Sequence, residues 1–332
     1  MPNIRLSDVA NAANVSLATV SRVMNSSGYV ADGVKAHVEN VASELGYIHP
    51  VKNRKKTSQN VIGVISNYNS LSPYFPTLYH HIQKTAILHG YYCVEVTAES
   101  LDDDALAFHA TELLKMEVSA LIIMGYLSDS LNQKCRQILN NSSVPVVFLE
   151  RTADCQGFHR IFVDNSLGTY EATKYLLEQG HTHLLYLAYG KKANEERKRL
   201  FGFSRAIDTY KKMSIHKTII TTREISPRSG SAGVLKALQE DPGITAIVAW
   251  NDILASGAEN ALLSIGKRIP EDIELIGCDN ILAPYLPVPI PSIAMPLAEI
   301  ASAALEIIDK SLKAKQKPSP RTLTLEPTLS LK

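Results

Sequence analysis

A run of basic side chains marks the chain near its amino-terminal end. Four of the five residues from 52 to 56 are basic, namely Lys52, Arg54, Lys55 and Lys56. Ammonium and guanidinium groups at this density attract phosphates without sequence preference, and salt weakens that attraction steeply. The same composition, following Pro50, is also typical of a solvated linker. Both interpretations stay open for residues 49–60.

The basic run belongs to an uneven distribution of charge. The whole chain of 332 residues has a formal net charge of +1, which argues against a polybasic nucleic-acid binder. Residues 1–60, however, carry a net charge of +3, and the remainder carries −2. A basic head on a slightly acidic body points toward nucleic acid, although an imbalance of this size also arises by chance.

Several chemistries are excluded by what the chain lacks. It contains no Walker A, G-x-G-x-x-G, H-E-x-x-H or G-x-S-x-G motif, so neither an enzyme nor a cofactor site is expected. The four cysteines are far apart and form no C-x-x-C pair, which excludes the usual zinc spacing and fits a reducing cytoplasm. No apolar run is long enough for a membrane span, and the first residues lack the apolar core of a signal peptide.

The sequence of the head predicts short helices. Ser7 or Asp8 is expected to begin the first, and Ser16 to cap a second that turns Val20 and Val23 inward. Only Asn14 and Val15 separate that first helix from Ser16, which predicts a helix-turn-helix. A third helix is indicated by apolar residues at helical spacing, ending at Gly46. These residues are Val34, Val38, Val41, Ala42 and Leu45.

After Asn60, strand-like and helix-like segments alternate. Such alternation predicts parallel sheets covered on both faces, here as two doubly wound lobes with a ligand crevice at the carboxyl ends of the strands. The expected strands are Val61–Ser66, Tyr91–Thr97, Ser119–Met124, Val144–Leu149, Leu184–Ala188, Thr218–Thr221, Ala246–Ala249 and Glu274–Cys278. The helical stretches include Thr77–His89, Asp103–Lys115, Leu167–Gln179 and Ile253–Ile265.

The segment Asp8–Asn25, DVANAANVSLATVSRVMN, resembles the LacI/GalR family of bacterial transcription regulators. The family pattern is D-V-A-x-x-A-G-V-S-x-x-T-V-S-R-V-x-N, and nearly every fixed position matches. The resemblance extends over nearly the whole chain through Leu45–Tyr47, Ile62–Ile65, Ser72–Phe75, Arg199–Phe203, Trp250–Asp252, Ile269–Asn280 and Pro291–Ile293. It implies a small all-α helix-turn-helix head and an α/β body of two doubly wound lobes resembling periplasmic sugar-binding proteins.

For the head, the resemblance implies that the second helix lies in the major groove of DNA. Arg22 is the expected base reader, because a guanidinium bonds guanine O6 and N7 together. The other implied contacts are Ser16, Leu17, Ala18, Thr19, Ser21 and Asn25. The alternative interpretation of Thr19 and Ser21 is that they are capping or solvated residues. Asn14 replaces the family's turn glycine and tolerates the left-handed conformation.

The resemblance also implies domain boundaries. The head covers residues 1–48, and a basic hinge covers residues 49–60. One lobe comprises about 61–161 and 291–322, and the other about 162–290 and 323–332, with crossings near Phe162, Ile290 and Leu323. The family's hinge carries a leucine that enters the minor groove. Here no leucine follows Pro50, so phosphate contacts of the basic run are expected instead.

For the body, the resemblance implies a small-molecule effector between the lobes, held by Tyr74, Phe75, Glu150, Arg151, Arg199, Asn251 and Asp279. Carboxylates, amides and guanidinium groups suit the hydroxyls of a sugar. The two arginines suit a sugar acid or phosphate equally well. Three simpler interpretations remain. Asp252 caps the following helix, Arg199 shares a solvated face with Arg197 and Lys198, and Tyr74 and Phe75 belong to the core.

The expected function is an effector-controlled transcriptional repressor, acting as a cytoplasmic homodimer on an inverted-repeat operator. A solute-binding protein for a transporter and a sugar-metabolising enzyme are the alternatives. The head and the missing signal peptide oppose the first, and the missing catalytic motif opposes the second.

Overall fold

The computed structural model divides the chain into two compact units, Met1–Thr57 and Ser58–Lys332. The structure describes residues 6–24, 29–45, 47, 60–67, 72–98, 101–125, 131–150, 155–190, 194–210, 214–314 and 318–331. Within these ranges no helix has the length and apolar character that crossing a membrane requires.

The first unit, referred to below as the head, contains α1 (Leu6–Ala12), α2 (Leu17–Met24) and α3 (Asp32–Glu44). Its core consists of small side chains, which allow the three short helices to approach closely. The buried residues are Val9, Ala10, Ala13, Val20, Val23, Val38 and Ala42. Two expectations need correction. The first helix already includes Leu6, and Val34 lies at the surface, because α3 turns Val38 and Ala42 inward.

The turn between α1 and α2 has the predicted chemistry. Asn14 adopts a left-handed conformation with a φ of 50°. Ser16 caps α2, since its Oγ accepts the backbone N–H of Thr19 at 3.1 Å. His37 Nε2 of α3 lies 3.2 Å from the carbonyl oxygen of Ala13, which ties the third helix to the turn. The helix-turn-helix is therefore confirmed in the described part of the head.

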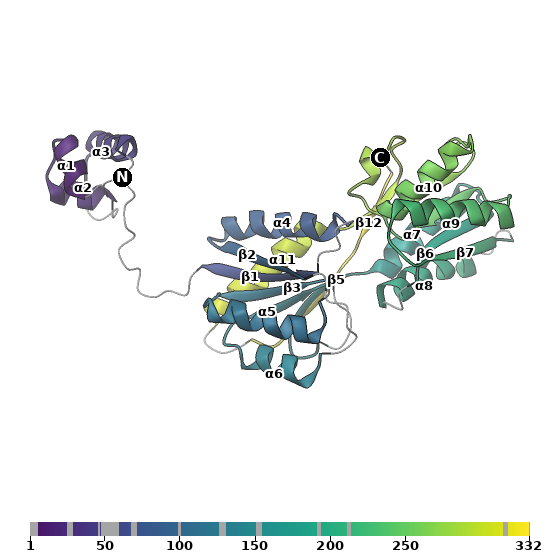
Figure 1. The fold of residues 1–332 in the computed structure, drawn as a ribbon, viewed down its shortest axis with the longest axis horizontal. Coiled ribbons are helices and arrows are strands. Elements are labelled where there is room, and N and C mark those ends of the chain that lie inside the picture. Colours follow the sequence, from purple (N-terminus) through teal and green to yellow (C-terminus); the bar gives the residue numbers. More distant parts are fainter. Residues whose placement is uncertain are drawn as a thin grey trace. The chain divides into compact units, whose positions relative to one another are not determined.

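The second unit, the body, contains two parallel sheets. The sheet of the first lobe has the strand order β11-β5-β4-β3-β1-β2, and all its pairs are parallel. Figure 1 shows α4 and α11 on one face of it and α5 and α6 on the other. The strands are β1 (Val61–Asn67), β2 (Tyr92–Ala98), β3 (Ala120–Met124), β4 (Val146–Leu149), β5 (His159–Val163) and β11 (Thr322–Leu325). The helices are α4 (Tyr74–Leu88), α5 (Asp103–Lys115), α6 (Gln133–Asn141) and α11 (Leu297–Lys313).

The sheet of the second lobe has the order β12-β10-β9-β8-β6-β7 and is parallel except for its β12–β10 pair. Its strands are β6 (His183–Tyr189), β7 (His216–Thr222), β8 (Ala246–Ala249), β9 (Glu274–Asp279), β10 (Ser292–Ala294) and β12 (Thr328–Ser330). Its helices are α7 (Asn165–Glu178), α8 (Asn194–Thr209), α9 (Pro227–Glu240), α10 (Asp252–Ser264) and the short 3-10 helix η1 (Ala283–Tyr285). The predicted fold class of a helical head with a two-lobed α/β body is confirmed.

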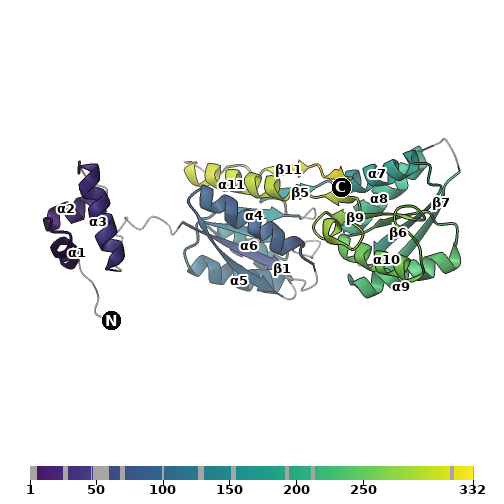
Figure 2. The ribbon, with the colours of Figure 1, turned by 90° about the horizontal axis from the view of Figure 1, so that it is seen from above.

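The chain passes between the lobes three times. The first passage follows β5, where Asp164 caps α7 and its backbone N–H donates to the carbonyl of Leu325 at 2.9 Å. The second follows β10, which pairs with β9 in the second lobe, so the chain crosses at Met295–Pro296 rather than near Ile290. The third follows β11, which pairs with β5, so it lies at Glu326–Pro327 rather than near Leu323. Figures 1 and 2 show β5 and β11 side by side at this point.

Candidate DNA interface and effector site

The exposed face of α2 presents most of the predicted DNA contacts. Leu17 is 52% exposed, and Ala18 and Arg22 are also exposed, while Val20 and Val23 on the opposite face are buried. Ser21 is partly buried. The amphipathic character of the helix therefore leaves a guanidinium and two apolar side chains accessible for groove contacts.

Two other predicted contacts take part in the helix start. The hydroxyls of Ser16 and Thr19 lie 2.8 Å apart, and Ser16 also accepts the backbone N–H of Thr19. The capping interpretation of Thr19 therefore has structural support. Asn25, Lys52, Arg54, Lys55 and Lys56 lie outside the described residues.

In the body, the predicted effector residues follow strand ends in both lobes. Tyr74 begins α4 after β1, Glu150 follows β4, and Asp279 ends β9. Glu150 and Asp279 have positive φ angles of 58° and 101°, which residues with a Cβ rarely adopt. Backbone strain of this kind concentrates at functional sites.

Arg199 of α8 occupies the centre of the site and is 7% exposed. Its Nε donates to Asn165 Oδ1 at 3.1 Å, and its Nη1 donates to the Trp250 carbonyl. Its Nη2 lies 3.8 Å from Asp279 Oδ1, and the guanidinium carbon lies 4.6 Å from the centre of the Trp250 ring. A solvated position for Arg199 is therefore wrong.

Burial and neighbouring charges shift the ionisation of this group of residues. Burial raises the pKa of Asp279 to about 8, even though the Arg199 charge lowers it. Burial also raises the pKa of Tyr74 well above its usual value, and the Glu150 and Asp279 charges add to this rise. These mutual effects show that Tyr74 and Glu150 of one lobe lie near Arg199 and Asp279 of the other.

Phe75 packs beside this group. Its ring makes an edge contact with the Tyr74 ring at 5.3 Å between centroids. A Cβ on Gly125, just after β3, would lie 3.0 Å from the Phe75 ring, so the glycine makes room for it. Arg151 lies outside the described residues.

The structure gives the capping role to Asn251 and not to Asp252. Asn251 caps α10, with its Oδ1 accepting the backbone N–H of Leu254 at 3.0 Å. The expected capping role of Asp252 is wrong, because its carboxylate turns inward to a neighbouring loop. One oxygen accepts the backbone N–H groups of residues 281, 282 and 283, and the other accepts the Ser292 hydroxyl at 2.7 Å.

Sequence reasoning missed three residues of this site. Asn165 follows the first crossing and binds Arg199. Glu196, one turn before Arg199 on α8, accepts the backbone N–H of Tyr189 at 3.1 Å. Trp250 contacts Arg199 through both its ring and its carbonyl. The only available signal was Trp250 itself, the single tryptophan of the chain, directly after an expected strand.

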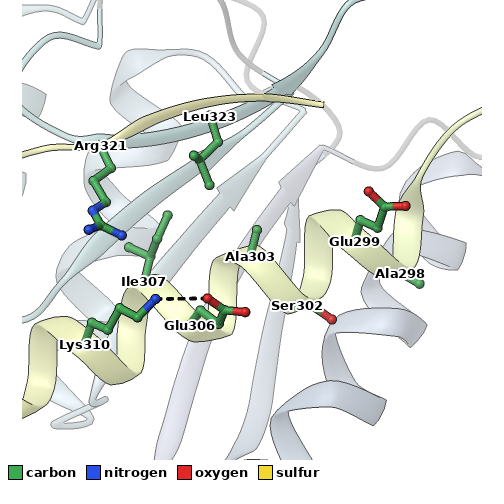
Figure 3. Close-up of a pocket in the computed structure, with 9 residues that line it drawn as sticks. All are labelled: Ala298, Glu299, Ser302, Ala303, Glu306, Ile307, Lys310, Arg321 and Leu323. Atoms are coloured by element: carbon green, nitrogen blue, oxygen red, sulfur yellow. Dashed lines mark hydrogen bonds and ion pairs between the residues drawn. The ribbon is translucent and has the colours of Figure 1, made fainter. Parts of the chain in front are cut away.

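A groove of about 360 Å³ lies elsewhere on the first lobe, between α11 and β11 (Figure 3). Lys310 and Glu306 form an ion pair at 3.0 Å along its wall, and Arg321 and Leu323 line the other side. None of the predicted effector residues lines it. Among the described residues, no group of three or more His, Cys, Asp and Glu side chains could hold a metal ion.

Comparison with known proteins identifies the family. The model for bacterial regulatory proteins of the lacI family matches residues 5–50, and the model for a periplasmic binding protein-like domain matches residues 173–332. The chain is 30% identical over 313 residues to the HTH-type transcriptional repressor PurR of Aliivibrio salmonicida, covering 93% of this chain and 92% of that protein.

Two solved structures extend this likeness. The lac repressor dimer bound to operator and the anti-inducer ONPF superposes with a TM-score of 0.74 at 25% identity, covering 100% of this chain and 98% of that one. The transcriptional regulator CelR–cellobiose complex shares the fold, with a TM-score of 0.67 at 22% identity, covering 99% and 98%. The chain belongs to the lacI family of bacterial regulatory proteins and is a DNA-binding transcriptional repressor, not an enzyme.

Proposed function

We propose that two copies of this chain bind an inverted-repeat operator. A sugar or sugar derivative held between the lobes of each body controls the affinity of the protein for this operator. The protein performs this role in the cytoplasm, where its operator lies. The observation that carries the proposal is the group of Tyr74, Glu150, Arg199 and Asp279, which comes from both lobes and of which Tyr74 and Arg199 are buried. A ligand that contacts both lobes shifts their relative orientation by its differential affinity for the two arrangements.

The DNA half of the proposal assigns base reading to α2. Arg22 bonds a guanine, while Leu17 and Ala18 contact apolar base edges such as a thymine methyl. Ser16, Thr19, Ser21 and Asn25 bond phosphates, and Lys52, Arg54, Lys55 and Lys56 add a non-specific phosphate attraction. The exposure of Leu17, Ala18 and Arg22 on one face of α2 supports this assignment.

The effector half assigns seven side chains. Glu150, Arg151, Arg199, Asn251 and Asp279 supply hydrogen-bonding groups, and Tyr74 and Phe75 supply an aromatic wall. A sugar suits this set because its dense hydroxyls both donate and accept hydrogen bonds. The relative whose solved complex contains cellobiose shares the fold, which is consistent with such a ligand.

A homodimer is supported by exposed apolar side chains in both lobes. In the first lobe, Ile87, Leu88 and Tyr92 are 63%, 80% and 72% exposed around the turn from α4 to β2. In the second lobe, Leu263, Ile265 and Tyr285 are exposed at the end of α10 and in η1. Apolar groups gathered in this way mark interaction surfaces.

The DNA half is tested by selecting bound duplexes from a random library with the full chain. Enrichment of inverted repeats is expected, and Arg22→Ala should weaken binding by about 1–3 kcal/mol and relax the preference at one base pair of each half-site. Replacing Lys55 and Lys56 together with alanine should reduce the dependence of affinity on salt. Failure to enrich any sequence would contradict the proposal.

The effector half is tested by a thermal-shift screen of sugars, sugar acids and sugar phosphates, because a ligand that binds only the folded state raises its melting temperature. Asp279→Asn should abolish the shift. A gel shift on the selected operator, with and without the stabilising compound, then shows whether that compound changes DNA affinity. A shift that survives Asp279→Asn would place the binding elsewhere.

A further inference from the structure

Two buried polar atoms beside Arg199 have no hydrogen-bond partner among the described residues. They are the indole nitrogen of Trp250 and the Oε1 atom of Glu196. A buried polar group without a partner loses its hydrogen bonds to water and gains none in return, so folded proteins keep few of them without a reason. One of these atoms is a donor and the other an acceptor.

The Trp250 ring contacts two neighbouring side chains. The Arg199 guanidinium lies over it, and the Tyr189 ring lies 5.2 Å away at an interplanar angle of 53°. The Trp250 backbone N–H donates to the carbonyl of Leu187 at 3.0 Å, which fixes the residue to the end of β6. The direction of the indole N–H is therefore preorganised, which lowers the cost of binding to it.

Glu196 is fixed in a similar way. It is 8% exposed, and its Oε2 accepts the backbone N–H of Tyr189, so its Oε1 remains as the available acceptor. Burial raises its pKa to about 7, while Arg199 opposes the rise. Burial raises the pKa of the Tyr186 hydroxyl, and the Glu196 charge adds to this rise.

We propose that Trp250 and Glu196 are specificity-determining residues of the effector site, and that they select a ligand through its hydroxyl groups. A hydroxyl accepts a hydrogen bond from the indole N–H and donates one to a carboxylate oxygen. An ether in its place can only accept, and a methyl group can neither accept nor donate. A site with buried polar groups rejects analogues that leave those groups unpaired. This inference rests on the proposed effector site and names two contacts beyond it.

The test uses the full chain and a set of neutral sugars, cellobiose among them, each added separately. Binding is followed by the melting temperature and by the emission of Trp250, the only tryptophan. The variants are Trp250→Phe, which keeps a ring but removes the N–H, and Glu196→Gln, which keeps the shape but removes the carboxylate. Glu259→Gln is the matched control, because this buried carboxylate in α10 holds the backbone N–H of Val288 and is not part of the proposed site.

A sugar that stabilises the wild type should also change the emission of Trp250. Its affinity should fall about tenfold in each of the two site variants, which corresponds to one lost hydrogen bond. It should not change in Glu259→Gln. Undiminished affinity in both site variants, or binding without an emission change, would overturn the inference. If none of the sugars stabilises the wild type, the sugar effector of the proposed function fails, and this inference fails with it.

Discussion

At the scale of single residues, the site contains carboxyl groups that are difficult to ionise. Burial raises the pKa of Asp279 to about 8 from 3.8 and that of Glu196 to about 7 from 4.5. The folded state therefore binds more protons than the unfolded state between these values. Their contribution to the free energy of unfolding is fully present below about pH 4 and is lost as the pH rises through 7 and 8.

The first prediction follows from this sign. Between about pH 5 and pH 8, the melting temperature should decline, and Asp279→Asn or Glu196→Gln should make the decline shallower, because neither amide titrates. Glu299→Gln, at an exposed position of α11, controls for the loss of one charge and should leave the slope unchanged. Calorimetry across this range provides the measurement. If the melting temperature of both site variants declines with pH as steeply as that of the wild type, neither carboxyl titrates in this range.

The second prediction concerns Asp252, whose carboxylate accepts three backbone N–H groups and one hydroxyl. Asp252→Ala leaves these donors without a partner and should cost about 3 kcal/mol or more of the free energy of unfolding. Asp104→Ala is the control: its side chain is 81% exposed and only loosely paired with Lys134, so its effect should be within about 0.5 kcal/mol. Urea denaturation followed by circular dichroism measures both, and equal costs would refute the assigned role.

Asn251 and Asp252 also show how far sequence reasoning reaches at this scale. The motif predicted that Arg199 and Asp279 belong to one site, and they lie 3.8 Å apart. It assigned the cap of α10 to the wrong one of two adjacent residues, because both Asn and Asp are good caps. The choice depends on the loop at residues 281–283, which is remote in sequence and supplies three backbone donors to Asp252.

At the scale of elements, the third prediction contrasts two helical glycines. Gly257 of α10 lies so close to α9 that a Cβ would be 1.9 Å from the Pro227 carbonyl oxygen. Gly257→Ala should therefore separate the two helices and cost about 3 kcal/mol. Gly33 of α3 has nothing within 4 Å, so Gly33→Ala should instead stabilise the head by about 0.5 kcal/mol. Thermal unfolding of each variant shows whether the substitution raises or lowers the stability. Destabilisation by Gly33→Ala would contradict the absence of neighbouring atoms around Gly33.

Sequence patterns predicted most elements of the body. All eight expected strands and the expected helices are present, and even the four-residue strands β4 and β8 were found, because each is a continuous apolar run. The second and third crossings were displaced because β10 and β12 have only three residues each. Such short strands show no alternation of their own, and their place depends on pairing with β9 and with each other.

At the scale of the whole molecule, the fourth prediction concerns assembly. Leu88→Glu places a charge in the exposed apolar turn between α4 and β2, where burial against a second copy would desolvate it. The variant should be monomeric by analytical ultracentrifugation under conditions where the wild type is a dimer. Phe108→Glu is the matched control, because Phe108 is also exposed in the first lobe but lies on α5, on the other face of the sheet.

Loss of the dimer should affect DNA binding through geometry alone. The head does not contain Leu88, so affinity for a single half-site should remain unchanged. Binding to the inverted repeat, however, should fall by about 100-fold or more, because the second head is no longer held at a high local concentration beside its half-site. Measuring both duplexes with Leu88→Glu separates assembly from recognition. A dimeric Leu88→Glu variant that binds the inverted repeat at full strength would place the interface on another surface of the body.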